Sequence, residues 1–249
     1  MLYFLQIAYK GTHYHGWQRQ SNCLGVQQVI EDALTKMTRQ KCILIGCGRT
    51  DAGVHASQYF AHLRLEKEPV ANWQYKLNRM LPGDIAIQNI FPVPHFRHAQ
   101  YDATERTYQY FIHLDPDPFL ADFSSFYEIE EQQMGALQLC VKAIAKANDF
   151  RAFCKQPDKV DHTRCTIFSC SWETEENGRK MKFEITANRF LRGMIRLLVG
   201  NLLEVLKGRL SAEQFIRSLE TQEPLPYFTM AYPQGLYLSK VVYPYPLDE

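Results

Sequence analysis

Alternation of apolar and polar residues marks eight short segments of the chain as β-strands. In residues 104–114, for example, Tyr108, Tyr110 and Ile112 occupy one face, and the residues between them occupy the other. A period of two is typical of side chains that alternate between the two faces of a sheet. The predicted strands are residues 2–9, 43–45, 59–65, 85–91, 104–114, 165–174, 180–186 and 236–243.

Five other segments have apolar residues at helical spacing. In residues 26–37 apolar side chains recur every three or four positions, which indicates an amphipathic helix. The longest predicted helix starts at an Asn188 cap, and Asn177-Gly178 is predicted to turn a hairpin. The predicted helices are residues 26–37, 73–81, 131–147, 188–206 and 211–219. Strands and helices are mixed in both halves without strict alternation, which favours an α+β fold.

Composition and charge restrict the class of protein. The 249 residues are 46% hydrophobic and 22% charged, as expected for a globular chain. There is no apolar run of about 18 residues, so we expect no membrane span, and the first residues resemble a strand rather than a signal peptide. Seven cysteines without a CxxC pair indicate scattered thiols in a reducing cytoplasm. The histidines match no ligand framework, so we expect no metal.

The formal net charge of +1 argues against nucleic-acid binding through overall charge, but the charge is unevenly distributed. Residues 179–209 hold eight Lys or Arg and two Glu, a local charge of +6. Residues 115–131 hold six acids and no base, and with two prolines they are expected to form an exposed connection. A basic segment of this kind suits phosphate binding.

The most unusual segment is residues 48–53, Gly-Arg-Thr-Asp-Ala-Gly. Two glycines flank an arginine, a hydroxyl and the Asp51 carboxylate directly after a predicted strand. An aspartate placed in this way can act as a nucleophile, a general base or a metal ligand. The alternative is a turn aspartate that caps its own backbone. The spacing is not that of a phosphate-binding P-loop.

Arg196 lies in the most apolar of the predicted helices, between Ile195 and a Leu-Leu-Val run. Arg189 and Arg192 are predicted to share its helix face. A guanidinium in such surroundings must reach solvent or find a partner, because an unpaired buried charge costs several kcal/mol. A pair with Asp51 would keep that carboxylate ionised at neutral pH. A structural salt bridge unrelated to chemistry is the alternative, and both stay open.

Several aromatic residues could stack on RNA bases. The alternative is that they belong to the core or the sheet. The candidates are Tyr14, Trp17, Tyr59, Tyr101, Tyr108 and Tyr110.

Six segments together resemble the tRNA pseudouridine synthase A family. One is residues 48–56, Gly-Arg-Thr-Asp-Ala-Gly-Val-His-Ala, which is a long and specific match to the family's signature loop. The other matching segments are residues 9–20, 106–110, 149–153, 190–196 and 235–243. They follow in family order and cover nearly the whole chain.

The resemblance implies a fold and an activity. The fold would be pseudouridine synthase-like, with two related lobes and a largely antiparallel central sheet flanked by helices. Residues 1–105 would form the lobe with the catalytic loop, and residues 106–249 the lobe with the basic helix and the closing strand. The activity would be isomerisation of uridine to pseudouridine at positions 38 to 40 of the tRNA anticodon stem-loop. The resemblance also implies a cytoplasmic homodimer that needs no cofactor, with tRNA lying across both subunits.

The resemblance also implies site residues. Asp51 would be the essential catalytic aspartate, and Arg196 would pair with it. Tyr108 would pack on the target uracil, Arg49 would help to turn the uridine out of the stack, and Leu236 would line the uracil pocket. One departure is Gln100, where the family often has an arginine, and it puts RNA affinity in doubt more than chemistry.

Two other classes of function compete with the isomerase. A non-catalytic tRNA-binding relative that assists folding would not need the intact set of Asp51, Tyr108 and Arg196. A small-molecule nucleosidase would usually need a second carboxylate or a metal beside Asp51, and the sequence offers no convincing candidate.

Overall fold

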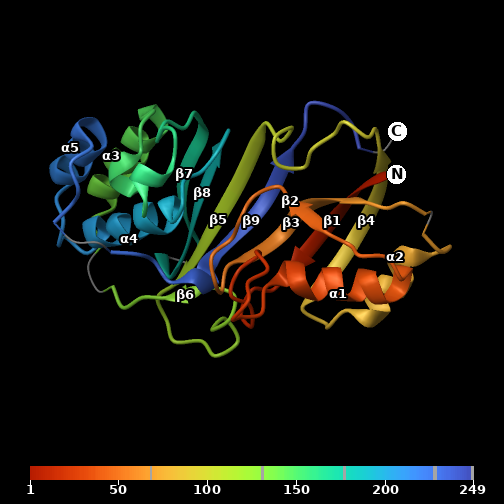
Figure 1. Cartoon of the computed structure of the whole chain (residues 1–249). Helices are drawn as coiled ribbons and strands as arrows, with labels where there is room; N and C mark the ends of the chain where they lie inside the picture. Colours follow the sequence, from red (N-terminus) through yellow and green to blue (C-terminus); the bar gives the residue numbers. More distant parts are fainter. Residues whose placement is uncertain (68, 130–131, 176–177, 227–228, 248–249) are drawn as a thin grey trace. The chain divides into compact units, whose positions relative to one another are not determined.

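The computed structural model describes residues 1–67, 69–129, 132–175, 178–226 and 229–247, which form two compact units (Figure 1). Unit 1 comprises residues 1–106 and 237–249, and unit 2 comprises residues 107–236. The predicted lobes, residues 1–105 and 106–249, stay a prediction. Asn177 of the predicted hairpin turn lies outside the described residues, as do residues 130–131 of the acidic stretch.

Unit 1 contains a mostly antiparallel sheet. β1 (Leu2–Tyr9) lies between β3 (His55–Arg64) and β4 (Ile85–Val93), and it is antiparallel to both. β2 (Leu44–Gly46) pairs antiparallel with the second half of β3. β9 (Leu236–Val242) pairs parallel with the start of β3. Residues 65–235 therefore separate β3 from β9 in the sequence, although the two strands pair.

Two helices complete unit 1. α1 (Val26–Thr38) buries an apolar stripe of Val26, Ile30 and Leu34, as its spacing predicts. α2 (Trp73–Met80) ends just before Pro82, whose ring disfavours helical backbone in the preceding residue.

Unit 2 contains further strands and, among its described residues, three α-helices. β8 (Lys180–Ala187) lies between β5 (Glu105–His113) and β7 (Ile167–Glu175), and β6 (Ser125–Phe126) pairs parallel with β5. The helices are α3 (Met134–Lys146), α4 (Met194–Leu206) and α5 (Ala212–Thr221). Short 3₁₀ turns occupy Arg151–Phe153, Pro157–Lys159 and Pro233–Gly235. Strands and helices mixed in this way in both units confirm the α+β class.

The helix predicted for residues 188–206 starts six residues later than predicted. α4 begins at Met194, because Gly193 takes a left-handed conformation with φ of 72°. Asn188 has a different role, since its Oδ1 accepts a hydrogen bond from the Thr166 backbone N at 2.8 Å. The predicted common helix face for Arg189, Arg192 and Arg196 is therefore wrong, because only Arg196 is helical.

The acidic stretch is only partly the exposed connection that its composition predicts. Phe119 is 88% exposed, but Ser124 and Ser125 are buried and lead into β6. β3 also begins at His55 rather than at the predicted residue 59.

None of the helices among the described residues combines the length and apolarity needed to span a bilayer. All seven cysteines carry free thiols, five of them buried.

Candidate functional site

The Asp51 loop connects β2 to β3 and is held by hydrogen bonds on both sides of the carboxylate. The Tyr59 hydroxyl donates to the Gly48 carbonyl oxygen at 2.6 Å, and the Tyr9 and Thr50 hydroxyls are 2.8 Å apart in a buried position. After the carboxylate, the Val54 backbone N donates to the Asp51 carbonyl oxygen at 3.2 Å. The Asp51 side chain is half-buried between these anchors.

A second loop, residues 11–18, packs against the Asp51 loop. The Trp17 backbone N donates to the Thr50 carbonyl oxygen, and the Gly53 backbone N donates to the Tyr14 carbonyl oxygen. Gly16 makes this approach feasible. Its φ is +84°, and a methyl group at this position would lie 2.2 Å from the Thr50 carbonyl oxygen. No residue larger than glycine fits here without moving one of the two loops.

Polar side chains fix the second loop in turn. The Gly11 backbone N donates to Nδ1 of buried His55 at 2.9 Å, and the His55 ring stacks on Tyr237. The Tyr14 hydroxyl donates to Asp84 at 2.6 Å. Burial and this bond raise the pKa of Tyr14, so the phenol stays protonated.

Arg106 supports the start of the Asp51 loop. Its guanidinium donates to the carbonyl oxygens of Cys47 at 3.1 Å, Gln100 at 2.7 Å and Ala103 at 3.0 Å. Burial raises the pKa of the Cys47 thiol to about 11, so this cysteine next to the loop is not a nucleophile at neutral pH. In the sequence, Arg106 is visible as the first residue of an Arg-x-Tyr-x-Tyr strand, but the pattern does not indicate its structural task.

In unit 2, Arg196 lies in the first turn of α4 and is half-buried. Its Nε donates to the Ala231 carbonyl oxygen at 2.7 Å, and the Ala231 backbone N donates to the Arg196 carbonyl oxygen at 2.9 Å. These reciprocal bonds fix the direction of the side chain. They also join α4 to the irregular segment that precedes β9.

That segment lies against Gly200 on α4. A methyl group on Gly200 would lie 2.3 Å from the Thr229 carbonyl oxygen, so only glycine permits this contact. Further along, the Tyr110 hydroxyl lies 2.8 Å from both Ser125 Oγ and the Tyr232 carbonyl oxygen. The segment then leads directly to buried Leu236.

Tyr108 lies on β5, where the predicted strand places it. It is 9% exposed, and its ring meets Phe190 edge-to-face with centroids 5.1 Å apart.

Comparisons with known proteins agree with this arrangement of segments. A family model described as tRNA pseudouridine synthase matches residues 6–102 and 147–244. The chain belongs to the tRNA pseudouridine synthase family. The first match contains the Asp51 loop and the second contains Arg196 and Leu236, whereas Tyr108 lies between the two matches.

Curated relatives match over almost their full length. A tRNA pseudouridine synthase A from Bacteroides fragilis is 40% identical over 99% of this chain and 98% of its own. Proteins of the same name from Parabacteroides distasonis and Chlorobaculum tepidum are 39% and 36% identical, the first over 97% of this chain and 96% of its own, the second over 96% of both.

The site residues that the sequence predicts for this synthase family member are distributed over both units. Arg49 and Asp51 share one loop of unit 1, while Tyr108, Arg196 and Leu236 belong to unit 2. Arg49 is exposed, and no side chain in the described part of the chain bonds to its guanidinium. The pairing of Asp51 with Arg196 joins the two units and stays a prediction.

Most of the candidate stacking residues belong to the core of their unit. Tyr14, Trp17, Tyr59 and Tyr110 are at most 5% exposed, in agreement with the alternative interpretation. Tyr101 differs, since it is 78% exposed and stacks on His98.

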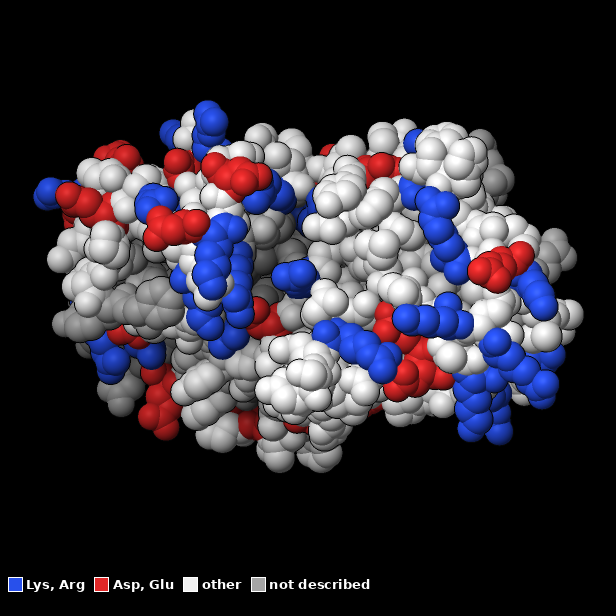
Figure 2. Space-filling view, viewed as in Figure 1, with Lys and Arg blue, Asp and Glu red and all other residues white. Residues whose placement is uncertain are grey.

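The basic segment 179–209 is partly neutralised by neighbouring acids. Arg179 pairs with Asp115 of the acidic stretch, and Lys182 pairs with Glu173 at 2.8 Å. Arg189 and Arg192 have no ion pair among the described residues; they contact His162 and Gln156 instead. Figure 2 shows Lys and Arg side chains gathered over α4 and β8 of unit 2. Arg189 and Arg192, just before α4, are therefore cations of the segment that no described acid neutralises by an ion pair.

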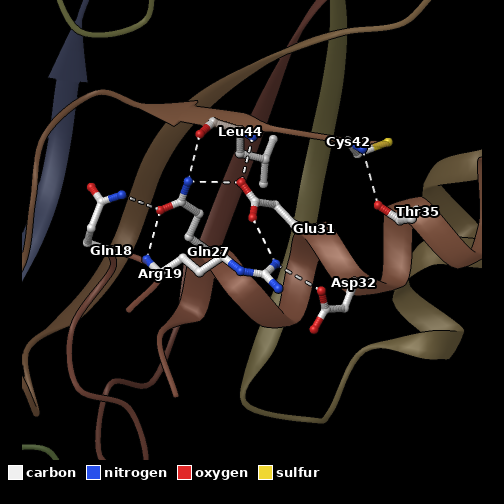
Figure 3. A network of polar contacts seen from close by, with 8 residues as sticks. All are labelled: Gln18, Arg19, Gln27, Glu31, Asp32, Thr35, Cys42 and Leu44. Atoms are coloured by element: carbon white, nitrogen blue, oxygen red, sulfur yellow. Dashed lines mark hydrogen bonds and ion pairs between the residues drawn. The ribbon is translucent and has the colours of Figure 1, made fainter. Parts of the chain in front are cut away.

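One group of polar residues near the Asp51 loop is not apparent from the sequence. Gln27, Glu31 and Thr35 form a stripe on α1, next to the apolar stripe that the helix buries (Figure 3). Gln27 is 6% exposed and Glu31 is 5% exposed. The only sequence signal is the spacing of four between these residues, which is also found on solvent-facing helix surfaces.

Proposed function

We propose that this chain isomerises uridine to pseudouridine in tRNA, at positions 38 to 40 of the anticodon stem-loop, with Asp51 as the catalytic carboxylate. The observation that carries the proposal is the construction of the Asp51 loop. Buried hydroxyls, a second loop and a guanidinium hold its backbone, while the carboxylate itself is half-buried. A carboxylate presented by a fixed backbone is what a reaction at a defined atom needs.

The reaction moves one glycosidic bond. The N1–C1′ bond of uridine breaks, the uracil turns, and a C5–C1′ bond forms. C5 loses its hydrogen as a proton and N1 gains one, so no redox partner or group donor is required. Asp51 either attacks C1′ or the ring as a nucleophile, or removes a sugar proton.

The remaining residues have supporting roles in this proposal. Arg196, whose direction is set by Ala231, pairs with Asp51 and fixes the direction of the carboxylate. Tyr108 packs on the uracil, and Leu236 lines its pocket. Arg49 helps to turn the target uridine out of the RNA stack, a step that costs a few kcal/mol.

The proposal extends to the setting of the enzyme. It acts without a cofactor, in the cytoplasm and as a homodimer, with tRNA lying across both subunits. The segment around residue 105 divides a lobe that carries Asp51 from a lobe that carries Arg196 and Tyr108. The support is the family resemblance of the segments in both lobes.

Release of tritium tests the proposal directly. The protein is incubated with unmodified tRNA that carries tritium at uracil C5, and label released to water is counted. We expect release without added cofactor, and its absence with wild-type protein would contradict the enzyme. Binding without release would support the non-catalytic tRNA-binding alternative.

Asp51→Asn tests the assigned carboxylate. We expect release to fall at least about 10³-fold while tRNA affinity changes less than about threefold, because the amide preserves shape and loses the ionised group. Asp32→Asn, the same change at an exposed position of α1, is the matched control and should behave as wild type. Equal release by Asp51→Asn and wild type would remove Asp51 from the reaction.

A further inference from the structure

The polar stripe of α1 acts as a partner for the outer edge of β2. The Leu44 backbone N donates to Glu31 Oε1 at 2.9 Å, and the Leu44 carbonyl oxygen accepts from Gln27 Nε2 at 2.9 Å. Just before the strand, the Cys42 backbone N donates to Thr35 Oγ1 at 3.2 Å. Side chains one helical turn apart therefore bind backbone groups that a neighbouring strand would otherwise bind (Figure 3).

The same two side chains also hold the second loop. Gln27 Oε1 accepts from the Gln18 side chain and from the Arg19 backbone N, both at 2.9 Å. The Arg19 guanidinium reaches Glu31 Oε2 at 3.2 Å and the exposed Asp32 at 2.9 Å. Gln27 Nε2 also donates to Glu31 Oε1 at 2.9 Å, which locks the pair together.

Such a network is demanding to maintain. A buried carboxylate costs several kcal/mol unless it is paired and hydrogen-bonded, and Glu31 receives bonds from Leu44, Gln27 and Arg19. An apolar residue at position 31 would pack against the neighbouring apolar stripe more simply. The buried charge therefore has a task that packing does not explain.

Both segments held by this pair lead to Asp51. β2 ends at Gly46, two residues before the signature loop begins. The second loop touches the signature loop through the Trp17 backbone N and the Thr50 carbonyl oxygen, and the Gln27 backbone N donates to the Trp17 carbonyl oxygen at 2.9 Å.

We infer that Glu31, together with Gln27, is a positioning residue for Asp51. The pair binds both β2 and the 11–18 loop to α1, so that the segments on both sides of the catalytic loop are held by one helix. The inference rests on the proposed function of Asp51. Displacement of a catalytic group by about 1 Å can cost about 100-fold in rate, so loss of this connection affects chemistry before it affects binding.

The test compares three variants of the full chain. Glu31→Ala removes the acceptor for the Leu44 backbone N. Glu31→Gln keeps an acceptor of the same shape there and gives up the contact with Arg19. Asp32→Asn is the matched control, because Asp32 pairs with the same Arg19 guanidinium as Glu31 but, among the described residues, bonds to neither β2 nor Gln27.

Two readouts separate positioning from plain stability. The first is the single-turnover rate of tritium release at saturating enzyme, at a temperature where circular dichroism shows each variant folded. We expect Glu31→Ala to be at least about tenfold slower with KM for tRNA within about threefold, and Glu31→Gln and Asp32→Asn to stay within about threefold of wild type. The second is backbone hydrogen exchange in residues 44–53, which should be at least about tenfold faster in Glu31→Ala alone.

The outcomes are distinct. A folded Glu31→Ala with the wild-type rate, or with unchanged exchange in residues 44–53, overturns the inference. If Glu31→Ala does not fold, Gln27→Ala removes the bonds to Leu44 and Arg19 without leaving a charge unpaired, and the same rate and exchange criteria apply. If wild type releases no tritium, the proposed function fails, and hydrogen exchange still decides whether Glu31 holds the loop.

Discussion

The Asp51 loop of unit 1 and the segment before β9 in unit 2 hold their key residues by a similar device. Each is irregular backbone pressed against a glycine, Gly16 in one case and Gly200 in the other. The anchors differ in origin. The Asp51 loop is held mainly by residues within 60 positions of the N-terminus, whereas the segment before β9 is held at Ala231 by α4 and at Tyr232 by Tyr110 of β5.

This difference shows how the backbone is made rigid at the two predicted site positions, Asp51 and Arg196. Where backbone bonds to backbone, as between Trp17 and Thr50, a change at one glycine should displace the whole loop. Where a side chain bonds to backbone in addition to a backbone bond, as between Arg196 and Ala231, the segment and the side chain should move together. The predictions below test the two arrangements, starting with the largest effect.

Gly16→Ala should strongly destabilise unit 1. The left-handed φ and the approach to Thr50 should together cost at least about 3 kcal/mol of the free energy of unfolding, measured by urea denaturation. Gly48→Ala is the control inside the catalytic loop, since a methyl group there would have no atom within 4 Å. An unchanged urea midpoint for Gly16→Ala would mean that the two loops are not tightly joined.

Gly200→Ala should separate the segment before β9 from α4. We expect a loss of about 2 to 3 kcal/mol in the free energy of unfolding, because a methyl group would overlap the Thr229 carbonyl oxygen. The rate of tritium release should also fall, since Ala231 would no longer hold Arg196. A variant that is destabilised but keeps the wild-type rate would contradict the role given to Ala231.

Lowering the pH should weaken unit 1 through His62 on β3. Its Nδ1 accepts from the Ala99 backbone N at 3.1 Å, and burial, with the nearby His98 and Arg64, lowers its pKa from 6.5 to about 4. The unfolded chain therefore takes up this proton first as pH falls below 6.5. Stability should be level above that pH and should lose about 2 kcal/mol by pH 5.

Urea denaturation at pH 7.5 and pH 5 measures this step, and His62→Asn should make it smaller by about 2 kcal/mol. The pKa of His98 and of His113 is also lowered by burial, so both contribute in the same direction. An identical pH step in His62→Asn would assign the effect to those two residues.

The smallest effect is expected for Gly135→Ala in α3. A methyl group there would have no atom within 4 Å, so the change should only reduce the freedom of the unfolded chain. We expect stabilisation by about 0.5 kcal/mol, seen as a rise in Tm. If Gly135→Ala lowers the free energy of unfolding, an unhindered glycine in a helix is not a valid reference for the effect of Gly200→Ala.

Periodicity and motif predicted different parts of this molecule. The strand 2–9 and the helix 26–37 follow from pattern alone and agree with β1 and α1. The glycine-rich loop was predicted after a strand, where β2 precedes it. The start of α4 was missed. The apolar run that contains the arginines has the same helical period in the sequence whether or not the helix is interrupted at Gly193. β6 was missed because two residues are too few to alternate.

The site was predictable only where residues are adjacent in sequence. Arg49 and Asp51 are brought together by one loop, but nothing in the pattern indicates that Ala231 accepts from Arg196 or that Arg106 supports Cys47. Such contacts join residues 35 and 59 positions apart. The Gln27–Glu31 pair was missed for another reason, since polar residues on a helix are usually solvated.

The polar stripe on α1 also bears on how this protein avoids aggregation with other copies of the same chain. Ile43 and Ile45 are 57% and 41% exposed beside a short strand, a combination that invites sheet extension and aggregation. The amide and carbonyl of Leu44 are already occupied by Glu31 and Gln27, so an incoming chain finds no open hydrogen-bonding edge at that residue. The strand that leads to the Asp51 loop therefore offers no open backbone group at Leu44 for templated self-association.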